Sequence, residues 1–298
     1  MNAAHATPAL HSILLTLVAT ALTAGAAEFF VATDGADSND GLSSTTAWRT
    51  INHALATVPQ GTAGNPSVIR VAAGTYAGES DGTYWKLNFR GKDYVHLIGA
   101  SAAQTMLTRG AAPREMSGAT GIIDLNQCTG ARVQGLRIVL DSYPTIWDAN
   151  VIRINSPDAV VVRDIWVDGL HTAPPDRCGR QVALYGTAGS GGLRIEHCCF
   201  SGGGLAFWLG VNGASCTIEI SHVTITDYAT TRTDDNCGFF DQRTGSDATP
   251  VRVRNSIFNA LNLGVNAATP TNRFGFLYHV ESNSYHALTQ GLVNQHVW

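Results

Sequence analysis

The chain has 298 residues, 44% of them hydrophobic, and a formal net charge of −4. A chain of this length and apolar content can bury a large core in one or two domains. It has no basic run and only two lysines, Lys86 and Lys92, so we expect neither nucleic acid nor a membrane as a partner of the mature form. The 31 glycines, among many Thr, Asn, Val and Ile residues, favour short strands with frequent turns.

The N-terminus is typical of an export signal. An apolar run at 12–27 ends in small residues, and Ala24-Gly25-Ala26 fits the small-x-small cleavage rule. The run is too short for a good membrane span, although no Lys or Arg precedes it. The sequence therefore predicts a signal peptide over 1–27 and a secreted, cell-surface or periplasmic protein, with a retained N-terminal anchor as the alternative. The mature chain then forms one domain, 28–298, which opens with a cap segment at 28–66.

An acidic stretch follows the first predicted strand. It contains four acids and amides within seven positions: Asp34, Asp37, Asn39 and Asp40. An EF-hand loop needs a bidentate Glu at its twelfth position, and counting from Asp37 that position is Trp48. We therefore expect Asx-turns that make the loop rigid, in place of a calcium site.

The residues after this loop predict a short capping helix. One apolar face repeats at i, i+3, i+4 and i+7: Ile51, Ala54, Leu55 and Val58. Such a helix would cover the open end of a sheet, which otherwise invites aggregation. A strand with Val71, Gly74 and Tyr76 in a V-x-x-G-x-Y pattern comes next.

This order of elements carries a family resemblance. Residues 29–79 resemble the opening segment of the pectate-lyase-like right-handed parallel β-helix superfamily, whose members often begin with a strand, a Gly/Asp/Asn loop and a capping helix. The resemblance implies an all-β, right-handed parallel β-helix. It says little about activity, because that superfamily includes lyases, hydrolases, epimerases and non-catalytic surface proteins.

From residue 133 onward the chain repeats itself. Six similar segments start at spacings of 29, 33, 25, 33 and 27 residues, and their first residues are Val133, Val162, Ile195, Ile220, Val253 and Val280. Periods of this length indicate a solenoid. Short β-rich runs between Gly, Asn and Asp turns predict a parallel β-helix whose coils stack about 4.8 Å apart.

The aligned segments predict further columns of stacked side chains. A second apolar column contains Leu136, Ile165, Cys198 and Val223 and ends in Ser256 and Asn283, and a third contains Ile138, Val167, Phe200, Ile225, Phe258 and Tyr285. A polar column lies between the first and second: Gly135, Asp164, His197, His222, Asn255 and Ser282. An acid–base site is one interpretation of it. The favoured one is a corner of each coil, where side chains satisfy stranded backbone groups.

The six cysteines lack the CxxC spacing of a zinc site: Cys128, Cys178, Cys198, Cys199, Cys216 and Cys237. Cys198 falls in an apolar column and should be buried, whereas Cys199 should face outward. A disulfide between Cys178 and Cys237 is an alternative to free thiols, and it needs Cα atoms within about 7 Å.

Long connections between coil strands predict a groove on one side of the solenoid. They fall at 139–150, 168–181 and 226–243, whereas 201–204 is short. Charged and aromatic residues concentrate in the long ones, which suits an extended polysaccharide that stacks on rings and offers hydroxyls and carboxylates to polar groups.

Three functions remain open for this groove. The leading one is a polysaccharide lyase that cleaves uronate-containing chains by β-elimination, which needs a cation on the carboxylate and a nearby base. Its candidate catalytic residues are Arg177, Arg180, Arg232 and His171. Its candidate substrate-binding residues are Tyr143, Trp147, Tyr228 and Arg243. Calcium is a candidate cofactor, with metal ligands among Asp234, Asp235 and Asp241.

The second is a non-catalytic adhesive or carbohydrate-binding solenoid. The charged run at 232–247 would then be a solvated loop. The third is a glycoside hydrolase with a carboxylate pair from Asp234, Asp235 and Asp241. The Gly-His-Gly signature expected of polygalacturonase-like hydrolases is absent from the sequence. We expect a monomer. Residues 287–298 read like the approach to another coil, as in a piece of a longer protein.

Overall fold

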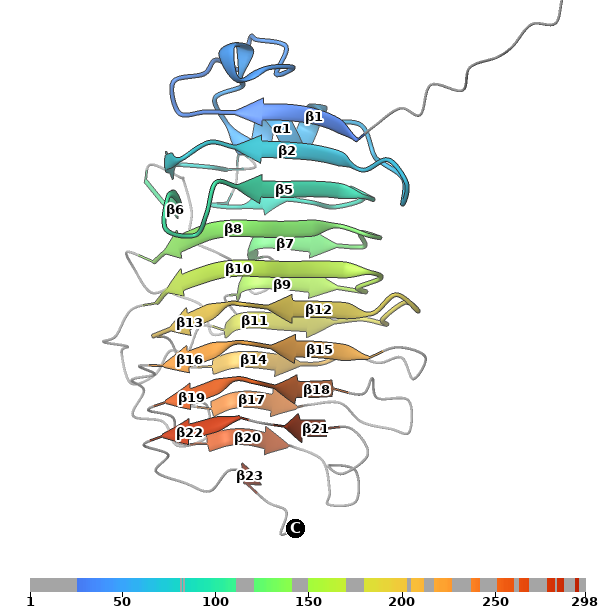
Figure 1. Cartoon of the computed structure of the whole chain (residues 1–298), viewed down its shortest axis with the longest axis vertical. Coiled ribbons are helices and arrows are strands. Elements are labelled where there is room, and N and C mark those ends of the chain that lie inside the picture. Colours follow the sequence, from blue (N-terminus) through green and yellow to red (C-terminus); the bar gives the residue numbers. More distant parts are fainter. Residues whose placement is uncertain are drawn as a thin grey trace, which may run out of the picture.

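The computed structural model winds the chain into a solenoid of stacked coils, with the N-terminal cap at one end (Figure 1). The residues that it describes are 26–80, 82, 84–110, 121–140, 150–169, 180–202, 205–211, 217–226, 237–241, 251–259, 263–267, 278–281, 283–286 and 293–294. Within these ranges, no helix is both long and apolar enough to cross a membrane. The predicted signal peptide lies almost wholly outside them.

Two parallel sheets form the walls of the solenoid. The first sheet runs through β1 (Ala27–Val31), β2 (Ser67–Val71), β5 (Val95–Gly99), β8 (Arg132–Val139), β10 (Val160–Asp168), β12 (Leu193–Glu196), β15 (Ile218–Ser221), β18 (Val251–Arg254) and β21 (Tyr278–Glu281). Its other strands are β3 (Gly74–Ala77), β6 (Thr105–Thr108), β13 (Cys199–Ser201), β16 (Thr224–Thr226), β19 (Ile257–Asn259) and β22 (Ser284–His286). The second sheet contains β4 (Leu87–Asn88), β7 (Gly121–Asn126), β9 (Asn150–Asn155), β11 (Arg180–Tyr185), β14 (Leu205–Leu209), β17 (Cys237–Asp241), β20 (Leu263–Ala267) and β23 (Val293–Asn294).

The strand register confirms the predicted columns. Each member of the first column pairs with the next: Val133, Val162, Ile195, Ile220, Val253 and Val280. The third column is paired in the same way. Where side chains are described, both columns are buried in one continuous core. Stacking of like apolar residues therefore holds the coils together, as the repeat implies.

The second column is buried as well and ends in polar contacts. Cys198 and Val223 are 3% and 1% exposed. Ser256 accepts a hydrogen bond from the backbone N–H of Val223, and its own N–H donates to Oδ1 of Asn283 at 2.8 Å. These two polar side chains therefore satisfy backbone groups between coils. Cys199 is half-buried and lies in register with the exposed Trp166, on the outer face as predicted.

The polar column forms a corner of the coil, as the favoured interpretation predicted, while the predicted hydrogen bonding of its side chains to the backbone stays a prediction. Its five described members all have left-handed backbone conformations, with φ of 72° at Gly135, 48° at Asp164, 55° at His197, 56° at His222 and 51° at Asn255. One such residue between two short strands redirects the chain. Glycine and asparagine tolerate this region well, whereas other residues adopt it at a cost.

The N-terminal segment forms the predicted cap. Helix α1 (Ile51–Thr57) follows a 3-10 turn, η1 (Ser44–Thr46), and its predicted apolar face is at most 2% exposed. Asp37 accepts hydrogen bonds from the N–H groups of Arg49 and Thr50, and Asp40 accepts from the N–H of Leu42. The acidic loop is therefore held by its own hydrogen bonds, and Asp40 forms the expected Asx-turn.

Candidate functional site

Charged side chains alternate with core residues on strands β7 and β9 of the second sheet. The segments 123–126 (Ile-Asp-Leu-Asn) and 152–155 (Ile-Arg-Ile-Asn) pair residue for residue. The Ile and Leu side chains of both are at most 1% exposed and face the core. Because successive side chains in a strand point to opposite faces, Asp124 and Arg153 lie on the outer face.

Asp124 holds two cations on this face. Arg153 Nη1 lies 3.1 Å from its Oδ1, and Lys86 Nζ lies 3.6 Å from its Oδ2. The Asp124 side chain is only 5% exposed, so the carboxylate needs these partners. A carboxylate engaged by two cations is poorly placed to act as an accessible base. Its evident task is to fix Arg153 and Lys86.

Two aromatic rings continue the row onto β11 and β14. The Tyr185 and Trp208 rings lie 4.5 Å apart and are tilted by 39°. Arg153 Cζ lies 5.2 Å from the centre of the Tyr185 ring. A Cβ at Gly210 would come within 2.3 Å of the Trp208 ring, so glycine leaves the space that the indole fills.

Arg180, at the start of β11, joins both rings. Its Nη1 donates a hydrogen bond to the Tyr185 hydroxyl at 2.9 Å, and its Cζ lies 4.7 Å above the Trp208 ring. Guanidinium stacking on an indole contributes about 0.5–2 kcal/mol, depending on its exposure. We call the set Lys86, Asp124, Arg153, Arg180, Tyr185 and Trp208 the second-sheet patch.

Three cationic side chains belong to the second-sheet patch. Lys86 and Arg153 pair with Asp124, and Arg180 contacts Tyr185 and Trp208. Within the described part of the chain, Nε of Arg153 and Nε1 of Trp208 are buried without a hydrogen-bond partner. The surface therefore combines donors, cationic groups and aromatic faces, which suit a ligand with anionic groups and flat apolar faces.

Of the predicted site residues, only Arg180 and the backbone of Asp241 fall within the described ranges. Arg180 belongs to the second-sheet patch. Asp241 ends β17 in register with Leu209 and Ala267. The other candidates lie outside the described residues: Tyr143, Trp147, His171, Arg177, Tyr228, Arg232, Asp234, Asp235 and Arg243. Cys178, the predicted disulfide partner of Cys237, lies outside them too.

The long connections all enter the second sheet at the same corner of the coil. They join β8 to β9, β10 to β11, and β16 to β17. Their ends therefore stack beside the first residues of these second-sheet strands. The connections themselves lie almost wholly outside the described residues, so their place along one side of the solenoid stays a prediction; Arg180 is the first residue of β11.

Five members of the second-sheet patch are not among the residues predicted from the sequence: Lys86, Asp124, Arg153, Tyr185 and Trp208. The predicted site residues lie in the connections, whereas these five lie in or beside strands. Aligning residues 123–126 with 152–155 would have exposed Asp124 and Arg153 as outward neighbours. Tyr185 and Trp208 carry no comparable signal, because their proximity depends on the lengths of the connections.

No protein-family model and no curated protein matches the chain. Among solved structures, pectin methylesterase from carrot aligns with 93% of this chain and 89% of its own, at 12% identity and a TM-score of 0.52. A pectin methylesterase variant in complex with a hexasaccharide aligns with 82% of this chain and 71% of its own, at 14% identity and a TM-score of 0.51. At these identities the likeness concerns the fold alone. The chain thus has the pectate-lyase-like right-handed parallel β-helix fold, closed at its N-terminal end by a short helix.

Proposed function

We propose that this protein binds a uronate-containing polysaccharide along the outer face of the second sheet. The observation that carries the proposal is the position of Arg180, which stacks on Trp208 and donates a hydrogen bond to Tyr185. A guanidinium beside two aromatic rings is the combination that suits a ligand with carboxylates and apolar sugar faces.

The cationic groups of the second-sheet patch favour an acidic polymer over a neutral one. Lys86, Arg153 and Arg180 all belong to it, and clustered cations attract polyanions. Two proteins with this fold are pectin methylesterases, one of them in complex with a hexasaccharide, which is consistent with a sugar chain as the ligand. The exported location expected from residues 1–27 would bring the protein to such polymers.

β-Elimination is the reaction that the second-sheet patch supports best. The Tyr185 hydroxyl accepts a hydrogen bond from Arg180, and Arg153 lies against the same ring. In the proposed step a guanidinium neutralises the uronate carboxylate, and a base, for which the Tyr185 oxygen is the candidate, takes the proton at C5. The C5–H electron pair forms the C4–C5 double bond, the C4–O bond breaks, and the leaving oxygen takes a proton from water.

A glycoside hydrolase finds less support. It needs two facing carboxylates, and on the described outer faces of β7, β9, β11 and β14 only Asp124 supplies one. A binding solenoid without catalysis uses the same second-sheet patch and differs only in the absence of product. The predicted calcium ligands remain a proposal that requires measurement.

The test is a titration of the full mature protein with polygalacturonate, alginate and a glycosaminoglycan, each with calcium or with a chelator, and with dextran as the neutral control. We expect binding of at least one acidic chain, and weaker binding by Arg180→Ala. Ultraviolet absorbance of new unsaturated ends would establish elimination. Binding without absorbance or new reducing ends would leave a binding solenoid, and equal binding of dextran would overturn the proposal.

A further inference from the structure

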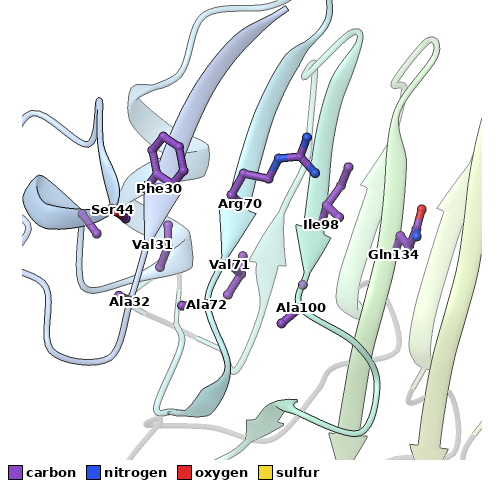
Figure 2. A pocket seen from close by; sticks show the side chains of 12 residues that line it. Phe30, Val31, Ala32, Ser44, Arg70, Val71, Ala72, Ile98, Ala100 and Gln134 are labelled. Atoms are coloured by element: carbon purple, nitrogen blue, oxygen red, sulfur yellow. The ribbon is translucent and has the colours of Figure 1, made fainter.

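A hollow lies on the outer face of the first sheet, near the N-terminal end (Figure 2). Its volume is about 440 Å³, within the roughly 300–1,000 Å³ typical of small-molecule sites. Its floor is a row of side chains in register across β1, β2, β5 and β8: Phe30, Arg70, Ile98 and Gln134. Ser44 and Ala47 line it from the loop before α1. We call it the N-terminal pocket.

Small residues keep this pocket open. Ala32, Ala72 and Ala100 follow the floor residues of β1, β2 and β5 at the ends of these strands, and all three line the hollow. Gly99 is required by a close approach of two coils, because a Cβ there would lie 2.1 Å from the carbonyl oxygen of Gly135. The hollow is therefore a consequence of side-chain size, and a larger side chain on its floor would fill it.

The charges of the N-terminal pocket cancel. Arg70 is its one charged lining residue, and Nε and Nη2 of Arg70 both donate to Oε1 of Glu28, at 3.1 and 2.7 Å. Both side chains are nearly half exposed, so this ion pair stabilises the fold weakly but fixes the guanidinium. An incoming anion would meet the Glu28 carboxylate beside the cation that it seeks.

The chemistry of the floor alternates between apolar and polar. Phe30 and Ile98 offer apolar surface, whereas the Gln134 amide both donates and accepts hydrogen bonds. A purely apolar ligand would desolvate the Gln134 amide without offering it a hydrogen-bond partner, at a cost. A sugar ring has apolar C–H faces and a rim of uncharged hydroxyls, which matches both kinds of surface.

We propose that the N-terminal pocket binds a neutral saccharide unit of one or two rings. This site goes beyond the proposed function, since it lies on another sheet and selects for another charge. The protein would then hold an acidic chain on the second sheet and an uncharged sugar, free or as a branch, on the first.

The experiment is saturation-transfer NMR on the full mature protein with methyl glycosides of galactose, glucose, xylose and arabinose, and with methyl galacturonoside as the charged comparator. Ala72→Leu fills the pocket. Ala73→Leu is the matched control, because Ala73 is exposed and does not line the pocket. We expect at least one neutral glycoside to bind the wild type and Ala73→Leu, and at least tenfold weaker binding to Ala72→Leu.

The two proposals fail separately. Arg180→Ala should leave the neutral glycoside signal unchanged, and Ala72→Leu should leave binding of the acidic chain unchanged. If circular dichroism reports a folding defect in Ala72→Leu, Gln134→Ala provides the second test and should also weaken binding. Absence of any neutral glycoside signal, equal binding by the pocket variants, or preference of the pocket for galacturonoside would overturn the inference.

Discussion

The imidazole rings of His197 and His222 stack in parallel, with centroids 4.7 Å apart and planes 4° apart. The two residues occupy the same corner of consecutive coils, and both have left-handed backbones. The ring spacing equals the strand spacing of a parallel sheet, about 4.8 Å. The corner therefore repeats as regularly as the strands on either side of it.

The first prediction concerns the residue type at this corner. A left-handed backbone costs an L-residue roughly 1–2 kcal/mol, is tolerated by Asn, and is least accessible to β-branched residues. His222→Asn should keep the free energy of unfolding within about 0.5 kcal/mol of wild type, and His222→Val should lower it by about 2 kcal/mol. Urea denaturation measures both. The extended Thr224→Val is the matched control, and equal stability of the two valine variants would contradict the prediction.

The second prediction concerns Glu79 under the cap. Its carboxylate is 5% exposed and accepts hydrogen bonds from the N–H groups of Ile51 and Asn52, at 2.7 and 3.0 Å. Burial raises the pKa of Glu79, and these hydrogen bonds offset the shift only in part. The folded state therefore binds the proton more tightly than the unfolded state. The free energy of unfolding should therefore fall as pH rises from the ordinary pKa of Glu through the raised pKa of Glu79.

Glu79→Gln isolates this contribution, because it keeps the shape and removes the titration. The stability of wild type relative to Glu79→Gln should decrease as pH rises through that interval, as measured by thermal or urea unfolding at a series of pH values. A relative stability that increases with pH would mean that the two N–H groups favour the charged form more than burial disfavours it.

The third prediction concerns the buried charges of the second-sheet patch. The side chains of Lys86, Asp124 and Arg153 are 11%, 5% and 15% exposed. Asp124→Ala removes the carboxylate that both cations share, so it should lower the free energy of unfolding by about 3–5 kcal/mol. The double variant Lys86→Met/Asp124→Ala removes one of the two cations that lose this carboxylate and should recover part of that loss. No recovery would mean that the two charges are not coupled.

Much of the fold is predictable from the sequence, because each coil must place apolar residues at equivalent positions. Val133, Val162 and Ile195 are separated by 29 and 33 residues, yet they pair directly. The corner was predictable for the same reason, since Asp164, His197 and Asn255 interrupt an apolar pattern at one position. The left-handed backbone follows from that interruption.

The candidate site was harder to predict. Asp124 and Arg153 become neighbours only because one coil stacks on another, and no local motif joins them. Trp208 meets Arg180 through a lateral contact whose geometry depends on connections of unequal length. The sequence analysis identified Arg180 as a cation for the ligand, but it assigned the supporting residues to loops where charges are dense. Stacking, rather than spacing along the chain, builds the second-sheet patch.

The last prediction separates the charge of Arg180 from its planar geometry. Lysine keeps the positive charge but cannot stack in a plane on Trp208 while it donates to Tyr185. Arg180→Lys should therefore weaken the binding of an acidic polysaccharide about tenfold, or about 1.4 kcal/mol, and Arg180→Ala should weaken it further. Isothermal titration at two salt concentrations measures both effects, because added salt screens the charge and not the stacking.

Gly210→Ala retains every functional group but would displace the indole, whose ring lies where the new Cβ must go. The affinity of Gly210→Ala for the acidic polysaccharide should be reduced, as that of Arg180→Lys is. The salt dependence of binding by Gly210→Ala should equal that of wild type. Equal binding by wild type, Arg180→Lys and Gly210→Ala would show that positive charge alone holds the chain and that the position of the Trp208 ring is irrelevant.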